Sequence, residues 1–141
     1  MKSRFVHCEF FRLLSDQHIG KKGDFVALEV NMRPSGGISP TMMNYANSTD
    51  VYEIWADMIA HDETDKGNSA SGFCVFTGRR NGRNYALSRD DLYRKYGDHI
   101  KEDAPVADAL SNTMGNYMYM ACFKTEEEIM EFVRTVFEES R

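Results

Sequence analysis

The sequence predicts an α+β protein, in which an antiparallel sheet near the N-terminus is followed by a small ββαβα layer. Short runs rich in aromatic and β-branched residues are typical of strands, and other runs have the apolar spacing and capping residues of helices. The polar stretch 61–71 divides the chain into two parts. We therefore expect residues 1–62 and 72–141 to form two segments that pack as one compact unit.

Two strands are expected in the first part. Residues 5–13 (FVHCEFFRL) and 24–30 (DFVALEV) are apolar and aromatic, and the polar loop 15–23 joins them. Two apolar runs joined by a single polar loop indicate neighbouring antiparallel strands. The sequence therefore predicts a hairpin centred on Ile19.

Two helices are expected after a loop rich in glycine and proline (34–40). A short helix is predicted around residues 41–46 and a firmer one over 51–60. Asp50, with Glu53 three residues later, resembles a capping box at the start of the second helix. These helices complete the first part of the chain.

The second part opens with a predicted hairpin. Residues 72–80 and 83–87 read as strands, and the Asn81-Gly82 dipeptide between them is the strongest short hairpin signal. Three further elements are expected: a helix from Ser88 to about residue 96, a strand over 116–123, and a final helix capped by Thr125 and Glu128. Together these elements give the ββαβα layer.

The composition excludes several classes of function. The chain has 141 residues, 28% of them charged, and a formal net charge of −5, which argues against a nonspecific nucleic-acid binder. No apolar stretch approaches the ~20 residues of a membrane span. We expect a cytoplasmic protein with neither a nucleic-acid nor a membrane partner.

Three cysteines are widely spaced along the chain and form no C-x-x-C pair. This pattern indicates neither a disulfide framework nor a zinc site. Because Cys8, Cys74 and Cys122 each lie among apolar residues, we expect all three to be small core residues.

Polar side chains alternate with apolar ones along the second strand and its extension. Because strand side chains point to opposite faces in turn, Glu29, Asn31 and Arg33 share one face. The opposite face is expected to be apolar and to comprise Val26, Leu28, Val30 and Met32. An acid, an amide and a guanidinium would thus form a row against a hydrophobic back.

The predicted hairpin places Glu9 opposite Glu29, with Cβ atoms about 5 Å apart. Two carboxylates in this position destabilise a sheet unless a cation lies between them. Mg²⁺ takes oxygen ligands from one or two carboxylates and completes its shell with phosphates and water. Asn31 would add an amide oxygen, so Glu9, Glu29 and Asn31 are the candidate metal ligands.

A phosphate-binding element is expected directly after this row. Arg33 carries a fork of donors that suits a phosphate or a carboxylate. Gly36 and Gly37 allow the backbone to approach an anion and to turn its N–H groups toward it. Two points stay open. Glu-x-Asn-x-Arg is also common on a solvated strand face. His7 lies on the same face as Glu9, and whether it has a role near the metal is left open.

The run 5–11 (FVHCEFF) and the later run 28–37 (LEVNMRPSGG) resemble the end of the ATP-grasp fold, as found in biotin carboxylase, carbamoyl-phosphate synthetase and the D-alanine ligases. By this resemblance Glu9 and Glu29 are Mg²⁺ (or Mn²⁺) ligands and Asn31 completes the shell of a second ion. Arg33 is implied as the catalytic contact to the reacting phosphate or substrate carboxylate. Asn31, Arg33, Gly36 and Gly37 are implied as contacts to ATP.

The resemblance implies an ATP-dependent carboxylate–amine or carboxylate–thiol ligase that acts through an acyl phosphate. The nucleotide-gripping part of that family precedes these motifs, so we expect a C-terminal fragment that is not active alone. Its partners would be ATP, a small carboxylate substrate and the missing N-terminal part, and a homo-oligomer is possible. The alternative is a non-catalytic orphan domain that acts as an association module.

Overall fold

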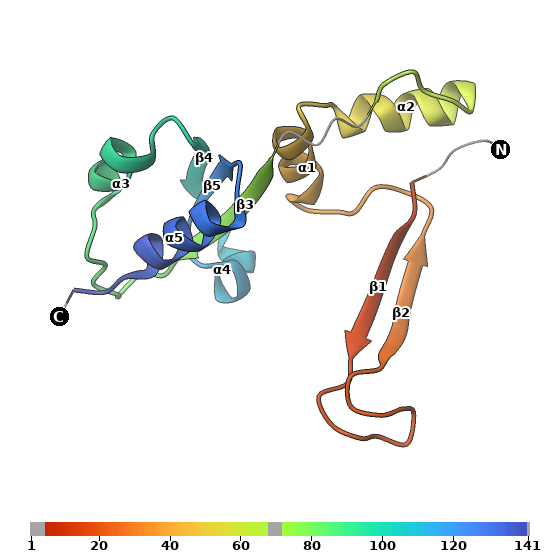
Figure 1. The fold of residues 1–141 in the computed structure, drawn as a ribbon, viewed down its shortest axis with the longest axis horizontal. Helices are drawn as coiled ribbons and strands as arrows, with labels where there is room; N and C mark the ends of the chain where they lie inside the picture. Colours follow the sequence, from red (N-terminus) through yellow and green to blue (C-terminus); the bar gives the residue numbers. More distant parts are fainter. Residues whose placement is uncertain (1–4, 68–71, 141) are drawn as a thin grey trace. The chain divides into compact units, whose positions relative to one another are not determined.

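The computed structural model describes residues 5–67 and 72–140. Its helices and strands confirm an α+β protein (Figure 1). In chain order they are β1 (His7–Arg12), β2 (Phe25–Asn31), α1 (Ser39–Asn47), α2 (Val51–His61), β3 (Phe73–Arg79), α3 (Arg89–Tyr96), β4 (Ile100–Pro105), α4 (Asp108–Met114), β5 (Tyr117–Phe123) and α5 (Glu126–Phe137). Across these two ranges, no helix is long and apolar enough to cross a membrane.

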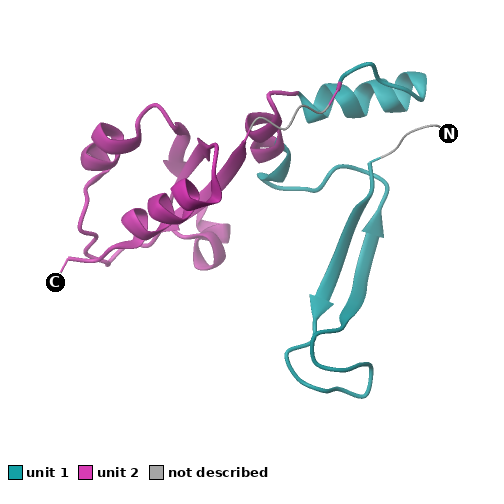
Figure 2. Cartoon of the chain, in the orientation of Figure 1, with its two compact units in different colours: residues 1–40, 50–66 teal, residues 41–49, 67–141 magenta. Residues whose placement is uncertain are grey.

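The chain divides into two compact units, coloured separately in Figure 2. Unit 1 comprises residues 1–40 and 50–66, and unit 2 comprises residues 41–49 and 67–141. Unit 1 therefore holds the β1–β2 hairpin and α2, whereas unit 2 holds the second sheet, the remaining helices and most of α1.

The predicted N-terminal hairpin is confirmed. β1 and β2 pair antiparallel, and Glu9 lies directly opposite Glu29. The loop between them is closed by a backbone bridge from Gln17 to Gly20, and the carboxylate of Asp16 accepts a hydrogen bond from the backbone N–H of Lys22 (2.9 Å). Local turn chemistry thus fixes the register that brings the two glutamates together.

The register shifts by one residue between Glu9 and Phe10, so that Phe10 pairs with Ala27 and Leu28 is the extra residue on β2. Directly opposed residues point to the same side of a sheet, so Val26, opposite Phe11, shares the face of Glu9. The prediction that Val26 lies on the apolar back is therefore wrong, because an uninterrupted period of two does not hold across a bulge.

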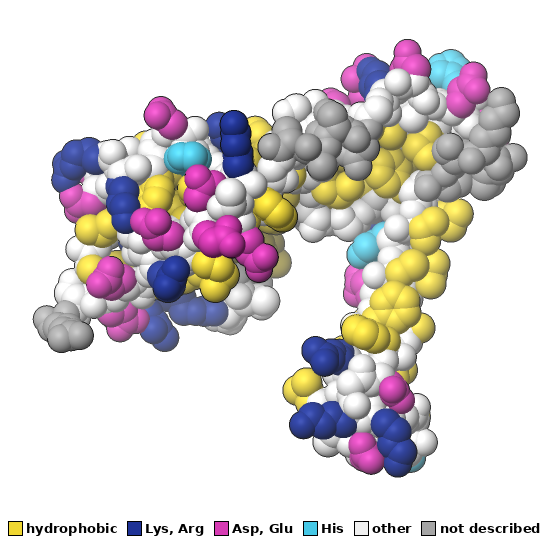
Figure 3. Space-filling model, in the orientation of Figure 1, with side chains coloured by type: hydrophobic (Ala, Val, Ile, Leu, Met, Phe, Trp, Pro, Cys, Tyr) yellow, Lys and Arg dark blue, Asp and Glu magenta, His cyan; other side chains and the backbone are white. Residues whose placement is uncertain are grey.

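The back of the hairpin is apolar and open to solvent. More than half of each large side chain on it is exposed, and Phe25 reaches 69%. Figure 3 shows hydrophobic side chains along the strands and charged ones around the loop. On the two strands these exposed side chains are Phe10, Phe25, Leu28 and Val30. We call them the apolar back of the hairpin.

Both predicted helices of the first part are confirmed. Asp50 caps α2, its carboxylate accepting hydrogen bonds from the backbone N–H groups of Tyr52 (2.9 Å) and Glu53 (3.2 Å). Glu53 also forms an ion pair with Lys66.

The sheet of unit 2 has the strand order β3-β5-β4, with both pairs antiparallel. The predicted hairpin between 72–80 and 83–87 is therefore wrong. Residues 83–87 lie outside the sheet and pair with the residues after α5. The N–H of Ala86 donates to the carbonyl of Glu138 (2.7 Å), and Tyr85 forms a β-bridge with Glu139. The ββαβα layer becomes βαβαβα.

The sequence does not predict strand β4, because its residues, IKEDAP, lack apolar alternation. Its carboxylates are instead satisfied by partners distant in the sequence. Glu102 accepts a hydrogen bond from the hydroxyl of Tyr45 (3.0 Å), and Asp103 accepts from Arg89 (2.6 Å). Long-range polar contacts therefore support an edge strand that composition alone does not reveal.

One face of this sheet carries the core of unit 2. Helices α3 and α5 pack their apolar residues against it, and both begin with a capping box. The buried cluster comprises Leu92, Tyr96, Ile100, Tyr119, Ala121, Phe123, Phe132 and Val136. The predicted final helix is thus confirmed, and its residues Phe132 and Val136 are buried in this core.

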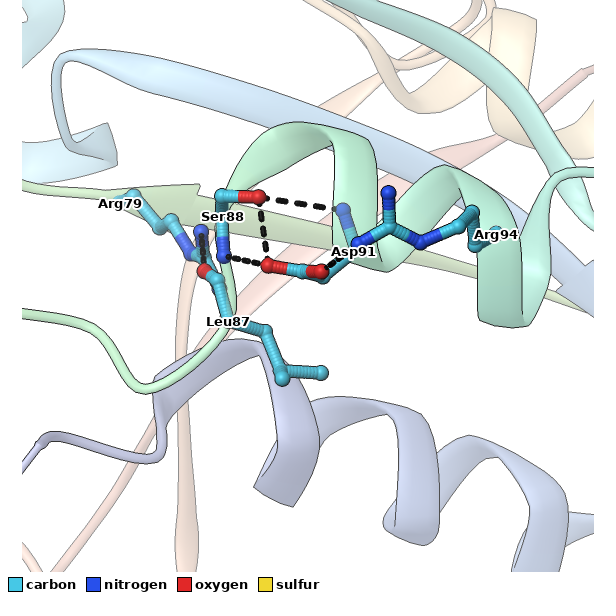
Figure 4. A network of polar contacts seen from close by, with 5 residues as sticks. All are labelled: Arg79, Leu87, Ser88, Asp91 and Arg94. Atoms are coloured by element: carbon cyan, nitrogen blue, oxygen red, sulfur yellow. Dashed lines mark hydrogen bonds and ion pairs between the residues drawn. The ribbon is translucent and has the colours of Figure 1, made fainter.

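Arg79 on β3 is hydrogen-bonded to two other segments of unit 2. Its side chain is 8% exposed, and it donates hydrogen bonds to the carbonyls of Val136 (2.9 Å) and Leu87 (2.8 Å). Figure 4 shows the second of these contacts beside the Ser88 capping box of α3. A single guanidinium therefore joins β3, the end of α5 and the start of α3.

Candidate metal centre on the β1–β2 hairpin

Three ligating side chains meet on one face of the hairpin. One ligand atom from each of His7, Glu9 and Glu29 lies within 4.8 Å of the others. In the parts of the chain that the structure describes, no other group of three His, Cys, Asp or Glu residues comes this close. The predicted pairing of Glu9 with Glu29 is confirmed as geometry.

His7 adds a nitrogen donor to the two carboxylates. Its Nε2 lies 3.5 Å from Oε1 of Glu9, and its side chain is only 22% exposed. Its Nδ1 is buried and has no hydrogen-bond partner among the described residues. Nε2, the ring nitrogen beside Glu9, is therefore the atom that could ligate a cation held by the two carboxylates.

Asn31 belongs to the same face. It lies opposite His7 in the register, and its Nδ2 donates a hydrogen bond of 2.6 Å to Oε1 of Glu29. Because the amide nitrogen is engaged with this carboxylate, the amide oxygen is the atom left to ligate. Asn31 thus orients Glu29 and still offers one oxygen donor.

The residues expected to bind phosphate lie outside the strand. β2 ends at Asn31, so the alternation predicted to extend to Arg33 stops two residues earlier. Arg33 is exposed in the bend that follows, and its Nη1 donates to the carbonyl of Pro34 (2.9 Å). The structure therefore does not place Arg33 in one row with Glu29 and Asn31.

The glycine loop is open. A Cβ atom added at Gly36 or Gly37 would meet nothing within 4 Å, and Gly37 has φ +64°, a conformation that glycine adopts without strain. The backbone there is accessible to an anion.

The donor set fits a divalent cation. Two carboxylates and an amide oxygen are ligands that Mg²⁺ and Mn²⁺ prefer, and an imidazole shifts the preference toward the transition metal. The like-charged pair Glu9–Glu29 is explained by an ion at this point, which Nε2 of His7, 3.5 Å from Oε1 of Glu9, could also ligate. These residues could hold one ion and leave positions for phosphate or water.

A second acidic group in unit 1 lines a cavity of about 470 Å³ near the end of α2. Asp57 accepts a hydrogen bond from the hydroxyl of Thr64 (3.2 Å) there, and His61, Glu63 and Asp65 complete the lining. These side chains do not converge as the hairpin residues do. We regard this cavity as the comparison site for any measurement of metal binding.

In unit 2, a cluster of hydrogen-bonded side chains around Asp103 lowers the pKa of its carboxyl group. Its carboxylate accepts hydrogen bonds from Arg89 and from the hydroxyls of Tyr93 and Tyr117 (both 2.6 Å). Arg89, and then the two hydroxyls, lower the pKa of Asp103 to about 2. Because the carboxylate of Asp103 is engaged by all three side chains, we assign this cluster a structural role.

The sequence matches no protein-family model and no curated protein. The resemblance stated above therefore rests on the residues of the hairpin and the loop that follows it.

Proposed function

We propose that residues 5–37 supply divalent-metal and phosphate ligands to an ATP-dependent ligase site of the ATP-grasp kind. The observation that carries the proposal is the convergence of His7, Glu9 and Glu29 within 4.8 Å. In this proposal Glu9, Glu29 and the oxygen of Asn31 hold Mg²⁺ or Mn²⁺, and His7 is an added ligand. A bound ion supplies charge neutralisation and orientation to the transferred phosphoryl group.

The residues after β2 complete the proposed site. Arg33 would leave the carbonyl of Pro34 and donate its fork to a phosphate or to the substrate carboxylate. The open backbone at Gly36 and Gly37 would receive a second anionic group. The site would phosphorylate a carboxylate, and an amine or a thiol would then displace the phosphate. Because ATP would be its co-substrate, the proposed ligase would act in the cytoplasm.

The hairpin contributes only one side of such a site. The proposal assigns no residue of 5–37 to the adenine ring, so it includes a further protein part that holds the nucleotide. This chain by itself should therefore bind ATP weakly and only with a divalent ion.

Isothermal titration calorimetry tests this directly. We expect weak, Mg²⁺-dependent binding of ATP to this chain, lost in Glu29→Gln and kept in Glu127→Gln, a matched change at an exposed position of α5. Micromolar ATP binding by this chain would contradict the argument that it holds one part of the site. Equal binding by the Glu29→Gln and Glu127→Gln variants would remove the metal assignment.

A second candidate function is self-association, favoured by the apolar back of the hairpin. Exposed apolar faces of this kind mark interaction surfaces, and a two-stranded sheet is marginal until such a face is covered. The occupant would be the same face of a second copy, stacked at about 10 Å. Sedimentation equilibrium of the chain and of its Phe25→Lys variant tests self-association. A dimer that is lost in Phe25→Lys supports this function, whereas a monomer for both proteins rules it out.

A further inference from the structure

Two cysteines lie opposite one another in the sheet of unit 2. Cys74 on β3 pairs with Cys122 on β5 in the antiparallel register. The expectation that all three cysteines are core residues is wrong, because Cys8 is exposed and the other two are only half-buried. The two opposed thiols play no part in the proposed metal centre.

The backbone shows which type of pair they form. The N–H of Cys122 donates to the carbonyl of His99 (2.9 Å), and the carbonyl of Cys122 lies 2.9 Å from Nδ1 of His99. Both polar groups of Cys122 therefore point away from β3. Cys74 and Cys122 are a non-hydrogen-bonded pair, the type in which the side chains come closest and the Cα atoms are about 4.5 Å apart.

This spacing permits a covalent bridge. Disulfides span Cα distances of about 4.4–6.8 Å. The strand pairing already holds the Cα atoms of the two cysteines within that range, so a disulfide can close without moving the two strands apart or together.

The two thiols differ in access. Cys122 lines a cavity of about 230 Å³ together with His99 and Tyr45, whereas Cys74 does not line it. Burial, followed by the charge and hydrogen bond of Cys122, raises the pKa of the Cys74 thiol to about 12. Cys122 is thus the sulfur that a small molecule in the cavity meets, and Cys74 stays protonated behind it.

We propose that Cys74 and Cys122 form a thiol–disulfide exchange site for a small-molecule disulfide, with Cys122 as the attacking sulfur and Cys74 as the resolving one. Oxidised glutathione represents this class of ligand. The product is a bridge between β3 and β5.

The reaction balances in two exchanges. The Cys122 thiolate attacks one sulfur of the small disulfide, whose S–S bond breaks and releases one small thiolate, which takes up a proton. The Cys74 sulfur, having lost its proton to water, then attacks Sγ of Cys122, and the mixed disulfide releases the second small thiol. Two protein thiols are oxidised to one disulfide, and one small disulfide is reduced to two thiols.

Mass spectrometry tests the proposal on the chain carrying Cys8→Ser, which removes the exposed third thiol. After incubation with oxidised glutathione, unfolding and alkylation, we expect a species two hydrogen atoms lighter than the reduced protein, with no alkyl group and a cross-linked peptide joining the two cysteines. Two alkylated cysteines, or glutathione on both without a cross-link, would overturn the proposal.

Two further variants in the Cys8→Ser background separate the roles of the sulfurs. With Cys74→Ser, one glutathione should accumulate on Cys122, because the resolving thiol is gone. With Cys122→Ser, modification of Cys74 should be at least about tenfold slower, since a protonated thiol outside the cavity is a poor nucleophile. Equal rates in the two variants, each with the far-ultraviolet circular dichroism of the parent, would contradict the assignment of Cys122 as the attacking sulfur.

Discussion

Replacing Asp103 by asparagine should destabilise unit 2 in a pH-dependent manner. The carboxylate accepts hydrogen bonds from Arg89, Tyr93 and Tyr117, and its side chain is 9% exposed. The Asp103→Asn substitution removes the charge and leaves three donor side chains around one acceptor oxygen. The loss should appear as a lower free energy of unfolding.

The magnitude follows from the pKa of Asp103, which is lowered from 3.8 to about 2. That difference corresponds to about 2.4 kcal/mol at 1.36 kcal/mol per pKa unit. The guanidinium of Arg89 is 53% exposed, so solvent screening reduces the expected contribution to about 1–2 kcal/mol.

The sign of the pH dependence is fixed by the direction of the shift. Because the pKa of Asp103 is lower in the folded state, its contribution is fully present above pH 3.8 and is lost as the pH falls toward 2. Urea unfolding near neutral pH should therefore separate Asp103→Asn from the wild type by about 1–2 kcal/mol. The gap should close as the pH is lowered through this interval.

Asp98→Asn is the matched control, because Asp98 is an exposed aspartate just before the same strand. We expect it to change the free energy of unfolding by no more than about 0.5 kcal/mol at any pH. A gap between Asp103→Asn and the wild type that stays constant down to pH 2, or one that Asp98→Asn reproduces, would refute the electrostatic argument.

Three other outcomes are expected. Arg79→Lys should cost about 2–3 kcal/mol in urea unfolding, because one ammonium cannot donate to the carbonyls of both Val136 and Leu87; a loss below about 0.5 kcal/mol would contradict this. Gly78→Ala should prevent stable folding, because its Cβ would lie 1.7 Å from the carbonyl oxygen of Met114. Gly36→Ala is the control and should leave the circular dichroism and the unfolding midpoint nearly unchanged. An equal effect of the two substitutions would be inconsistent with the close approach at Gly78. Amide hydrogen exchange should be faster along β1 and β2 than along β5, because the hairpin has an exposed apolar back and β5 is central in its sheet; the reverse order would be inconsistent with the fold.

Local patterns predicted the parts of the fold that depend on local physics. The capping residues Ser88 and Thr125 fixed the starts of α3 and α5, and the polar loop between two apolar runs indicated the first hairpin. The pairing of Glu9 with Glu29 followed from counting outward from the loop. The bulge on β2 has no clear sequence signal, so the predicted face of Val26 is wrong.

Pairings between distant residues could not be read in the same way. Asn81-Gly82 does form a turn, with Gly82 at φ +77°, but the strand that pairs with β3 begins only at Tyr117. Strand β4 has charged side chains whose partners are distant in the sequence. The juxtaposition of Cys74 and Cys122 likewise depends on this long-range register.

His7 shows how near the sequence came to the candidate site. Its position two residues before Glu9 places it on the ligand face, but nothing in the local pattern predicts that Nδ1 is buried without a partner among the described residues. Arg33 shows the opposite case, because alternation was extended beyond the point where the strand ends.

The most direct test of the metal assignment is line broadening by Mn²⁺ in the amide NMR spectrum of this chain. We expect broadening at low Mn²⁺ concentrations to be centred on His7, Glu9, Glu29 and Asn31 and to be lost in the Glu9→Gln/Glu29→Gln double variant. Broadening centred on Asp57, Glu63 and Asp65 at the other acidic cavity, or broadening of the hairpin that survives the double substitution, would contradict it.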